Sequence, residues 1–355
     1  MSQIVLNTDQ YLELEKITLG AYAPLRGFMN ESDFLSVIET MRLKTGELFP
    51  IPLSLDMSAQ DADKISGASM FQLVYNGDVV GEMVPESIFT INKPSVVAKI
   101  FGVEDPAHPG IDHFFKLGEI FVGGPVTLTK RATFETSAFE MTPAETKAIF
   151  KKRGWKTIAA FHTRNIPHRA HEWLQRLSLD LCDGLFIHPI IGRKKAGDFT
   201  PKAIMTGYKT LIEGFYPEDR VLLAALSTPG FYAGPREAVF HALIRRNYGC
   251  THIVIGRDHA GVGDYYDTYA SQKLCQDLEQ DLGITIMAFT APHYCKSCDG
   301  VVSEKTCPHM QTDPEMVTPV SGTEIRALLA DGKRPEPHIM RPKIVDSLNG
   351  IPLFT

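Results

Sequence analysis

The pattern of hydrophobic and polar positions along this chain changes near residue 150. Residues 1–150 carry short apolar stretches, among them PIPLSLD, FQLVYN and PVTLTK, and glycine, proline and aspartate separate them. This pattern predicts a β-rich region with short helices, one of them around SDFLSVIETMR.

Beyond residue 150, apolar segments alternate with amphipathic ones. Strands are expected at 157–161, 185–190, 221–226, 252–256 and 285–290. The intervening stretches AHEWLQRLSLDLC, FTPKAIMTGYKTLIEGF and GPREAVFHALIRRNY are amphipathic and are expected to be helices. The alternation predicts an α/β fold with a parallel sheet and right-handed crossovers, in which ligands bind at the carboxyl ends of the strands.

The composition is typical of a globular protein with two or three domains. The 355 residues are 44% hydrophobic and 22% charged. The N-terminus lacks the features of a signal peptide, and no apolar run approaches the roughly 18–20 residues of a membrane span. We therefore expect a cytoplasmic protein without a membrane partner. The net charge of −6 gives no overall attraction to nucleic acid, so an anionic ligand requires a local basic cluster.

Such a cluster follows the first expected strand of the α/β region. The stretch FHTRNIPHRAHE gathers three histidines and two arginines within ten residues. On a helix that starts near Pro167, His168 and His171 share one face, and the free N–H groups of its first turn point toward a phosphate. The two imidazoles can donate hydrogen bonds to a developing oxyanion. The alternative is a pair of capping or surface histidines, and the spacing lacks the HExxH pattern of a zinc helix.

Two more polar stretches follow strands of the same expected sheet. The stretch HPIIGRKKAGDF either contacts phosphate or forms a solvated loop, and both interpretations stay open. The residues concerned are Gly192, Arg193, Lys194, Lys195 and Gly197. In IGRDHAGVGDYY, glycines surround a run of arginine, aspartate and histidine that a purely structural loop rarely needs. Because all three stretches follow strands of one sheet, we expect them to converge on one edge.

The cysteines fall into two groups. Cys182, Cys250 and Cys275 are isolated in apolar or helical contexts, and we expect buried thiols. The others cluster with a histidine in a Cys3His set typical of a closed structural zinc site: Cys295, Cys298, Cys307 and His309. The C-x-H spacing is shorter than usual, so His293 is an alternative fourth ligand. Chance clustering of cytosolic thiols is the other interpretation.

Together, these motifs resemble those of the sulfate adenylyltransferase (ATP sulfurylase) family. The family motif QTRNPxHRAH corresponds to HTRNIPHRAH here, and GRDHAGPG corresponds to GRDHAGVG. The family's GFM and MRLxxGxxxPIP correspond to PLRGFM and MRLKTGELFPIP. Its SGTxxRxxLxxGxxP corresponds to SGTEIRALLADGKRP. The resemblance spans nearly the whole chain. It is to the compact bacterial form, since no GxxxxGK[ST] loop of a fused adenylylsulfate kinase occurs.

The resemblance implies a three-part fold and a reaction. We expect a β-rich PUA-like domain at 1–150, a Rossmann-like α/β nucleotidyltransferase domain at 151–290, and a small C-terminal domain with the zinc site at 291–355. The implied reaction is ATP + sulfate ⇌ adenylylsulfate + diphosphate, with Mg²⁺ on the nucleotide and a structural Zn²⁺. We also expect a homo-oligomer, a dimer.

The resemblance further implies roles for individual residues. Thr163, Arg164 and Asn165 would act in catalysis, and Arg164 would contact both sulfate and ATP. The histidines at 168 and 171 would bind ATP and stabilise the transition state on the phosphate side. The nucleotide would also contact Gly256, Arg257, Asp258 and His259, and sulfate would contact His162 and the backbone of Ala260. Sulfate is fully ionised, so catalysis needs charge stabilisation and positioning rather than a general base.

Two positions depart from the family pattern beside the acceptor. His162 replaces the glutamine, and Ile166-Pro167 displaces the proline. A histidine can still donate a hydrogen bond, but its charge depends on pH, so we expect sulfate affinity to weaken as pH rises through its titration. The alternatives are adenylyl transfer to a different oxyanion and a non-catalytic nucleotide-binding homologue. The intact TRN, HxxH and GRDH motifs argue against the second alternative.

Overall fold

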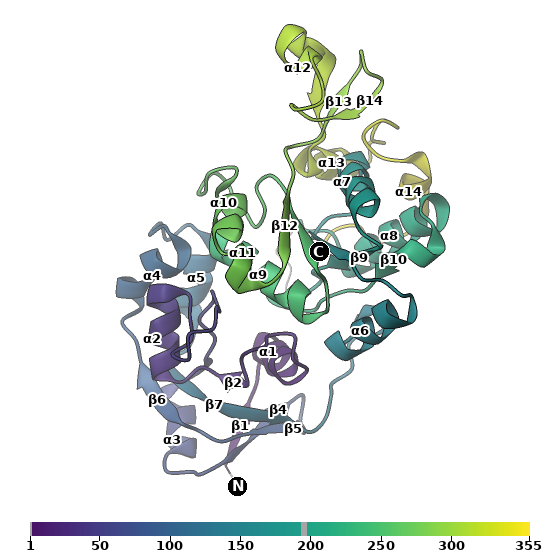
Figure 1. Ribbon diagram of the computed structural model, residues 1–355. Helices are drawn as coiled ribbons and strands as arrows, with labels where there is room; N and C mark the ends of the chain where they lie inside the picture. Colours follow the sequence, from purple (N-terminus) through teal and green to yellow (C-terminus); the bar gives the residue numbers. More distant parts are fainter. Residues whose placement is uncertain (1, 193–196) are drawn as a thin grey trace.

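The computed structural model describes residues 2–192 and 197–355 (Figure 1). Its N-terminal part is a seven-stranded, mostly antiparallel sheet with helices packed against it. The strands are β1 Gln3–Val5, β2 Gly27–Phe28, β3 Leu55–Met57, β4 Phe71–Tyr75, β5 Asp78–Met83, β6 Ser87–Thr90 and β7 Ile120–Leu128. The helices are α1 Thr8–Thr18, α2 Glu31–Thr40, α3 Ala59–Ile65, α4 Lys93–Phe101 and α5 Pro109–Lys116. The β-rich expectation and the helix around SDFLSVIETMR are both confirmed.

The long strand β7 organises this sheet, because it pairs with β2, β3, β5 and β6. Close approach of the backbones requires glycine in its middle. A Cβ on Gly123 would lie 2.0 Å from the carbonyl oxygen of Met29, and Gly124 has a φ of +151°. The short segments η1 Ser137–Phe139 and α6 Pro143–Lys152 lead from this sheet to the next, and Thr142 and Glu145 form a capping box at α6.

A five-stranded, wholly parallel sheet forms the centre of the molecule, as the strand–helix alternation predicts. Its order is β10-β9-β8-β11-β12. The strands are β8 Ile158–Thr163, β9 Gly184–Pro189, β10 Val221–Leu223, β11 His252–Ile255 and β12 Thr285–Ala288. The connecting helices are α7 Arg169–Leu181, α8 Pro201–Phe215, η2 Glu218–Arg220, α9 Pro235–Asn247, α10 Ala270–Asp277 and α11 Glu279–Leu282. β10 is shorter than expected, since Ala225 and Leu226 make only isolated bridges after Leu223.

Alternate residues of the parallel strands pack into two different cores. Ile158, Ala160 and Ile253 belong to a core that continues into the N-terminal sheet. Ala159, Phe161 and Val254 belong to a second core on the other face, shared with α8 and with C-terminal residues such as Ile344. This period-2 alternation buries both faces of the sheet, which is typical of parallel sheets. It also connects the sheet to both neighbouring parts of the chain.

The C-terminal part begins as a small antiparallel sheet that projects from the rest (Figure 1, top). It contains β13 His293–Cys295, β14 Gly300–Val302 and β15 Val317–Pro319, with α12 His309–Thr312 and η3 Pro314–Met316. The chain then returns to α7 and α8 through α13 Gly322–Ala330 and α14 Pro342–Ser347. A partly buried ion pair connects α14 to α7, in which Arg341 Nη2 lies 2.6 Å from Glu172 Oε1.

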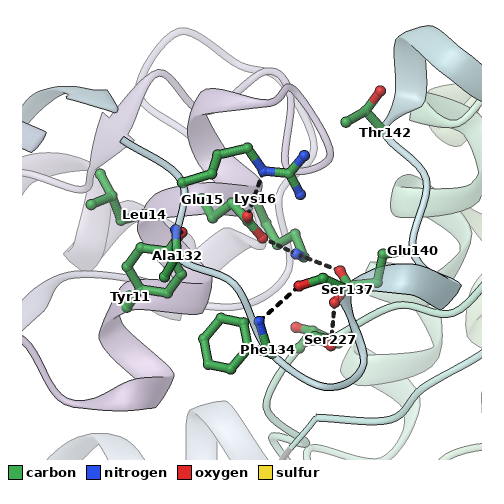
Figure 2. Close-up of polar contacts among 12 residues, drawn as sticks. Tyr11, Leu14, Glu15, Lys16, Ala132, Phe134, Ser137, Glu140, Thr142 and Ser227 are labelled. Carbon is green, nitrogen blue, oxygen red and sulfur yellow. Dashed lines mark hydrogen bonds and ion pairs between the residues drawn. The ribbon is translucent and has the colours of Figure 1, made fainter. Parts of the chain in front are cut away.

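Buried charges join α1 to the central part of the chain (Figure 2). Lys16 contacts the carboxylates of both Glu15 and Glu140, and the second distance is 3.1 Å. Arg131 Nε lies 2.9 Å from Glu15, and the Ser227 hydroxyl donates to Glu140 at 2.7 Å. Burial alone would raise the pKa of Glu15, but Lys16 and Arg131 hold that pKa below its ordinary value. The network therefore ties the N-terminal sheet to the loop that follows β10.

Within the described ranges, no helix has both the length and the apolar character needed to cross a bilayer. The isolated thiols of Cys182, Cys250 and Cys275 are buried, as expected. The division of the chain at residues 150 and 290 stays a prediction.

Candidate active site

A cavity of about 400 Å³ opens at the carboxyl ends of β8 and β11. The strand order makes this the point where the chain reverses direction across the sheet, since β9 and β10 lie on one side of β8 and β11 and β12 on the other. Ligands of open α/β sheets bind at such a switch point. The cavity is lined by eleven of the predicted site residues: His162, Thr163, Arg164, Asn165, His168, His171, Gly256, Arg257, Asp258, His259 and Ala260.

The TRN segment leaves β8 and turns into the cavity. Thr163 is the last residue of the strand, and its Oγ1 accepts a hydrogen bond from the backbone N–H of Asn165 at 3.1 Å. The guanidinium of Arg164 lies over the ring of Tyr232, 5.8 Å from its centroid. This contact joins the segment to the loop after β10.

The two histidines of HxxH lie together at the start of α7. The helix begins at Arg169 with His168 as its N-cap, so Pro167 precedes the helix instead of occupying its first turn. The rings of His168 and His171 stack with centroids 3.7 Å apart, which confirms that they share one face. Burial lowers the pKa of His168 to about 3 and that of His171 well below its ordinary value. Both imidazoles are therefore neutral at pH 7 and can act as N–H donors, but not as cations.

The GRDHAG loop has an unusual backbone. Asp258 and Ala260 have φ values of +54° and +59°, in the left-handed region that L-residues rarely adopt. The backbone N–H of Asp258 donates to Thr268 at 2.8 Å, and the Ser271 hydroxyl donates to the carbonyl of His259 at 2.6 Å. The strain is located at the predicted binding residues, as is common at functional sites.

The side chain of His162 lies partly exposed at the cavity wall. Its Nδ1 accepts a hydrogen bond from Arg245 Nη2 at 3.0 Å, and its ring stacks on His241 with centroids 4.0 Å apart. Burial and then the neighbouring His241 and Arg245 hold its pKa well below the ordinary value. This lowered pKa contradicts the expectation that His162 titrates near neutrality, and it argues against the predicted pH dependence of sulfate affinity, which stays a prediction.

The C-terminal part also contributes to this cavity, which the motifs alone did not predict. The residues that line it there belong to the SGTEIRALLADGKRP motif: Ser321, Gly322, Thr323 and Arg326. Arg326 Nη2 donates to Asn165 Oδ1 at 2.8 Å, so the start of α13 closes one wall. The N-cap at Ser321 and the arginine one turn later were the available signal.

The second polar stretch lies partly outside the described residues. Arg193, Lys194 and Lys195 lie outside them. Gly192 allows a close approach of its backbone to that of Thr228. A Cβ on Gly192 would lie 2.0 Å from the carbonyl oxygen of Thr228.

The Cys3His set gathers into a cluster that could hold a metal ion. The Sγ atoms of Cys298 and Cys307 lie 3.7 Å apart. His309 Nδ1 lies 3.5, 3.3 and 3.7 Å from the Sγ atoms of Cys295, Cys298 and Cys307, respectively. His293 instead directs its Nδ1 to the carbonyl of Ala291 at 2.9 Å, so His309 is the fourth member of the cluster.

Comparisons with known proteins agree on one family. Residues 137–350 match the family model ATP-sulfurylase, and residues 1–131 match the model of a PUA-like domain. A sulfate adenylyltransferase of Symbiobacterium thermophilum is 40% identical over 346 residues, which cover 97% of this chain and 87% of that protein. One of Chloroflexus aurantiacus is 42% identical over 344 residues, which cover 97% of this chain and 89% of that protein.

A solved structure shows the same fold. The hexameric APS kinase from Thiobacillus denitrificans superposes with a TM-score of 0.75 at 20% identity, covering 98% of this chain. This chain spans 62% of the length of that protein.

Proposed function

The chain belongs to the ATP-sulfurylase family, and we propose that it transfers the adenylyl group of ATP to sulfate, forming adenylylsulfate and diphosphate reversibly. One observation carries this proposal: the TRN, HxxH and GRDHAG segments line a single cavity at the switch point of the parallel sheet. That cavity is lined by N–H donors and guanidinium groups on several sides. It therefore suits two anions that must meet, and the intact site favours catalysis over a non-catalytic nucleotide-binding role.

The proposed chemistry is direct attack of a sulfate oxygen on the α-phosphorus. Sulfate needs no general base, so the protein must align the two anions and stabilise the charge that develops on the phosphates. We assign Arg164 to both substrates and the neutral N–H groups of His168 and His171 to the phosphate side. Thr163 and Asn165 hold the segment in place through the contacts described above. His162 and the backbone of Ala260 bind sulfate.

The nucleotide lies along the GRDH segment in this proposal. Gly256, Arg257, Asp258 and His259 contact it, and Mg²⁺ accompanies its phosphates. When bound, Mg²⁺ neutralises part of the phosphate charge. Arg326 adds a further cation at the C-terminal wall of the cavity, where its Nη2 lies 2.8 Å from Asn165 Oδ1.

We further propose that the Cys3His cluster binds a structural zinc ion. Donor atoms about 2.3 Å from a tetrahedral zinc lie about 3.7 Å apart, and the spacings within this cluster are close to that value. The ion would hold together a three-stranded sheet that has few buried apolar residues of its own. The cluster belongs to the projecting part of the chain and not to the wall of the cavity, so its role would be structural.

We also propose that the protein is a homodimer. Size-exclusion chromatography with light scattering would test this, and a mass of a single chain at micromolar concentration would contradict it.

The activity is tested by incubating the purified protein with ATP, Mg²⁺ and sulfate and measuring release of diphosphate together with adenylylsulfate. A pyrophosphatase in the assay removes one product and drives the forward reaction. Release should require sulfate, and Arg164→Ala should abolish it. Diphosphate release that is unchanged when sulfate is omitted, or absence of adenylylsulfate with the wild-type protein, would contradict the proposal.

A further inference from the structure

Arg245 of α9 is a buried guanidinium directly behind the acceptor end of the cavity. Its side chain is fully buried, with a relative exposure of 0%. Among the described residues, no aspartate or glutamate forms an ion pair with it, and its Nε has no hydrogen-bond partner. A buried cation without a carboxylate is costly to maintain, so a specific role for it is worth seeking.

The contacts of Arg245 fix the proton of His162. Its Nη2 donates to His162 Nδ1 at 3.0 Å and to the carbonyl of His188 at 2.9 Å. A guanidinium has no acceptor atom and stays protonated at neutral pH. Nδ1 of His162 must therefore present its lone pair to Arg245, and the single proton of the neutral ring must be on Nε2. In this tautomer His162 can donate through Nε2 but cannot accept.

The surrounding groups favour the same state. His241, also on α9, stacks on His162, and its Nδ1 lies 3.2 Å from His259 Nε2. The positive charges of Arg164 and Arg245 both disfavour protonation of all three imidazoles. A carboxylate also contacts this group, since Glu237 Oε1 lies 3.6 Å from His241 Nε2.

These three imidazoles could also be considered as ligands of a metal ion, because their nitrogens lie within 4.8 Å of one another. Two observations argue against that role. The lone pair of His162 Nδ1 is already engaged by a guanidinium, and two arginine charges act on the cluster. A site for an anion fits this arrangement better than a site for a cation.

We propose that Arg245 is a positioning residue that makes the acceptor subsite donate hydrogen bonds without accepting them, so that the site selects a fully deprotonated oxyanion. This inference rests on the proposed function. The groups assigned to the acceptor are the Nε2–H of His162, the guanidinium of Arg164 and the backbone N–H of Ala260, and all three are donors. Sulfate offers only acceptor oxygens, and it is bound. An oxyanion that carries a proton, such as hydrogen phosphate, brings a hydroxyl that meets no acceptor there and is disfavoured.

The proposal also accounts for histidine at a position where the family pattern has glutamine. An amide can present its oxygen to Arg245 and its NH₂ to the acceptor, which is the same division of roles that the Nδ1 and Nε2 atoms have here. His162→Gln is therefore the conservative variant. His162→Leu removes both functions.

The test compares steady-state kinetics of four full-length proteins: wild type, Arg245→Met, His162→Gln and Arg246→Met. The last is a matched control, because Arg246 is the neighbouring arginine of the same helix and contacts Leu282 and Ala23 instead of the cavity. Each protein is assayed for its KM for sulfate, its kcat and its inhibition by inorganic phosphate competing with sulfate, between pH 6 and 9. Circular dichroism establishes that each variant is folded.

Arg245→Met should raise the KM for sulfate about ten- to a hundredfold, as expected for loss of an oriented hydrogen bond to a charged group. The same variant should also be inhibited by inorganic phosphate more strongly relative to its affinity for sulfate than the wild type is. Removing the charge of Arg245 takes away one of the causes of the lowered pKa of His162, so that pKa should rise in this variant, and any fall in the KM for sulfate at the acid end should be confined to it. Arg246→Met should retain a low KM and a flat profile. His162→Gln should keep the preference for sulfate over phosphate, because its amide can divide the acceptor and donor roles in the same way. A folded Arg245→Met with wild-type KM, phosphate inhibition and pH profile would overturn the proposal.

A second measurement needs no substitution at Arg245. In ¹⁵N-histidine-labelled wild-type protein, the resonances lost in His162→Gln identify His162, and they should show an unprotonated Nδ1 and a protonated Nε2. A proton on Nδ1, or a doubly protonated ring at pH 7, would overturn the inference. If the wild type makes no adenylylsulfate at all, the proposed function fails instead, whereas the tautomer can still be read.

Discussion

Replacing His168 by alanine should reduce turnover strongly and leave the protein folded. The ring is buried, with 6% exposure, and among the described residues its Nδ1 has no hydrogen-bond partner. Folding therefore loses mainly the packing of one ring against His171, at a cost of about 1–3 kcal/mol. A domain of ordinary stability, about 5–15 kcal/mol, survives that loss.

The effect on catalysis has a different origin. His168 is the N-cap of α7, lines the cavity and is neutral, since burial lowers its pKa to about 3. Removing one preorganised donor from a site that stabilises developing charge costs about 2.7–4 kcal/mol, or roughly a hundred- to a thousandfold in kcat. Because the donor acts mainly in the transition state, kcat and kcat/KM for ATP should fall together.

The assay is continuous release of diphosphate at saturating ATP and sulfate, with thermal unfolding measured in parallel. His252→Ala is a suitable control, because His252 is the first residue of β11, at the opposite end of that strand from the cavity. It should retain nearly wild-type turnover. If His168→Ala were folded and lost less than about threefold in kcat, or if only its KM for ATP rose, the transition-state role of His168 would be wrong.

Other variants and conditions test the metal cluster, the buried histidines and the attachment of the C-terminal part. Elemental analysis of protein purified without chelators should find about one zinc per chain, and Cys298→Ser should lose the metal and unfold at a lower temperature; metal-free protein of unchanged stability would exclude the site. Stability should also fall as pH drops below 6.5. Burial holds the pKa values of His168, His188, His241 and His259 below the unfolded value of 6.5, so the unfolded state binds more protons there. Each of these histidines contributes up to about 1.4 kcal/mol per pH unit to the free energy of unfolding, and this contribution is present in full above pH 6.5 and lost on acidification. Urea titrations at pH 7.5 and 5.5 with equal midpoints would contradict this prediction. Finally, Arg341→Ala removes two hydrogen bonds of 2.6 and 2.7 Å to the buried Glu172 and should cost about 2–3 kcal/mol, less than a fully broken buried pair because Arg169 and Arg176 still contact that carboxylate. Chemical denaturation checks it, and an unchanged midpoint would show that the ion pair does not hold α14.

The central sheet could be predicted because its signals are local. Each strand is a short apolar run, the stretches between the strands have helical patterns, and the rule for parallel sheets then places the polar stretches after β8 and β11 at one edge. Local signals also have limits. The strand expected at 221–226 ends at Leu223, since Ala225 bridges to the distant Glu140 and Leu226 makes only an isolated bridge to Ile190, the residue after β9. A sequence pattern does not register such competition from distant segments.

The site residues that the sequence pattern does not predict come from distant segments of the chain. Arg326 of α13 reaches Asn165 across 161 residues of sequence, and Arg245 of α9 reaches His162 of β8 across 83. In sequence, Arg245 is one of two adjacent arginines in an amphipathic helix, and nothing distinguishes it from Arg246. The tertiary fold buries the first completely and leaves the second at the contact with the N-terminal part.

The protonation states of the histidines follow from the same tertiary burial and change the account of how the anions are held. The sequence shows a crowd of imidazoles and arginines, which suggests that both supply positive charge. In the fold, the imidazoles of His162, His168, His171 and His259 all have lowered pKa values, so at pH 7 the positive charge among the described residues that line the cavity comes from arginine. Arginine does not titrate near neutrality, whereas a histidine cation would be lost as pH rises. We therefore expect sulfate binding to depend little on pH across the neutral range, with the imidazoles contributing direction instead of charge.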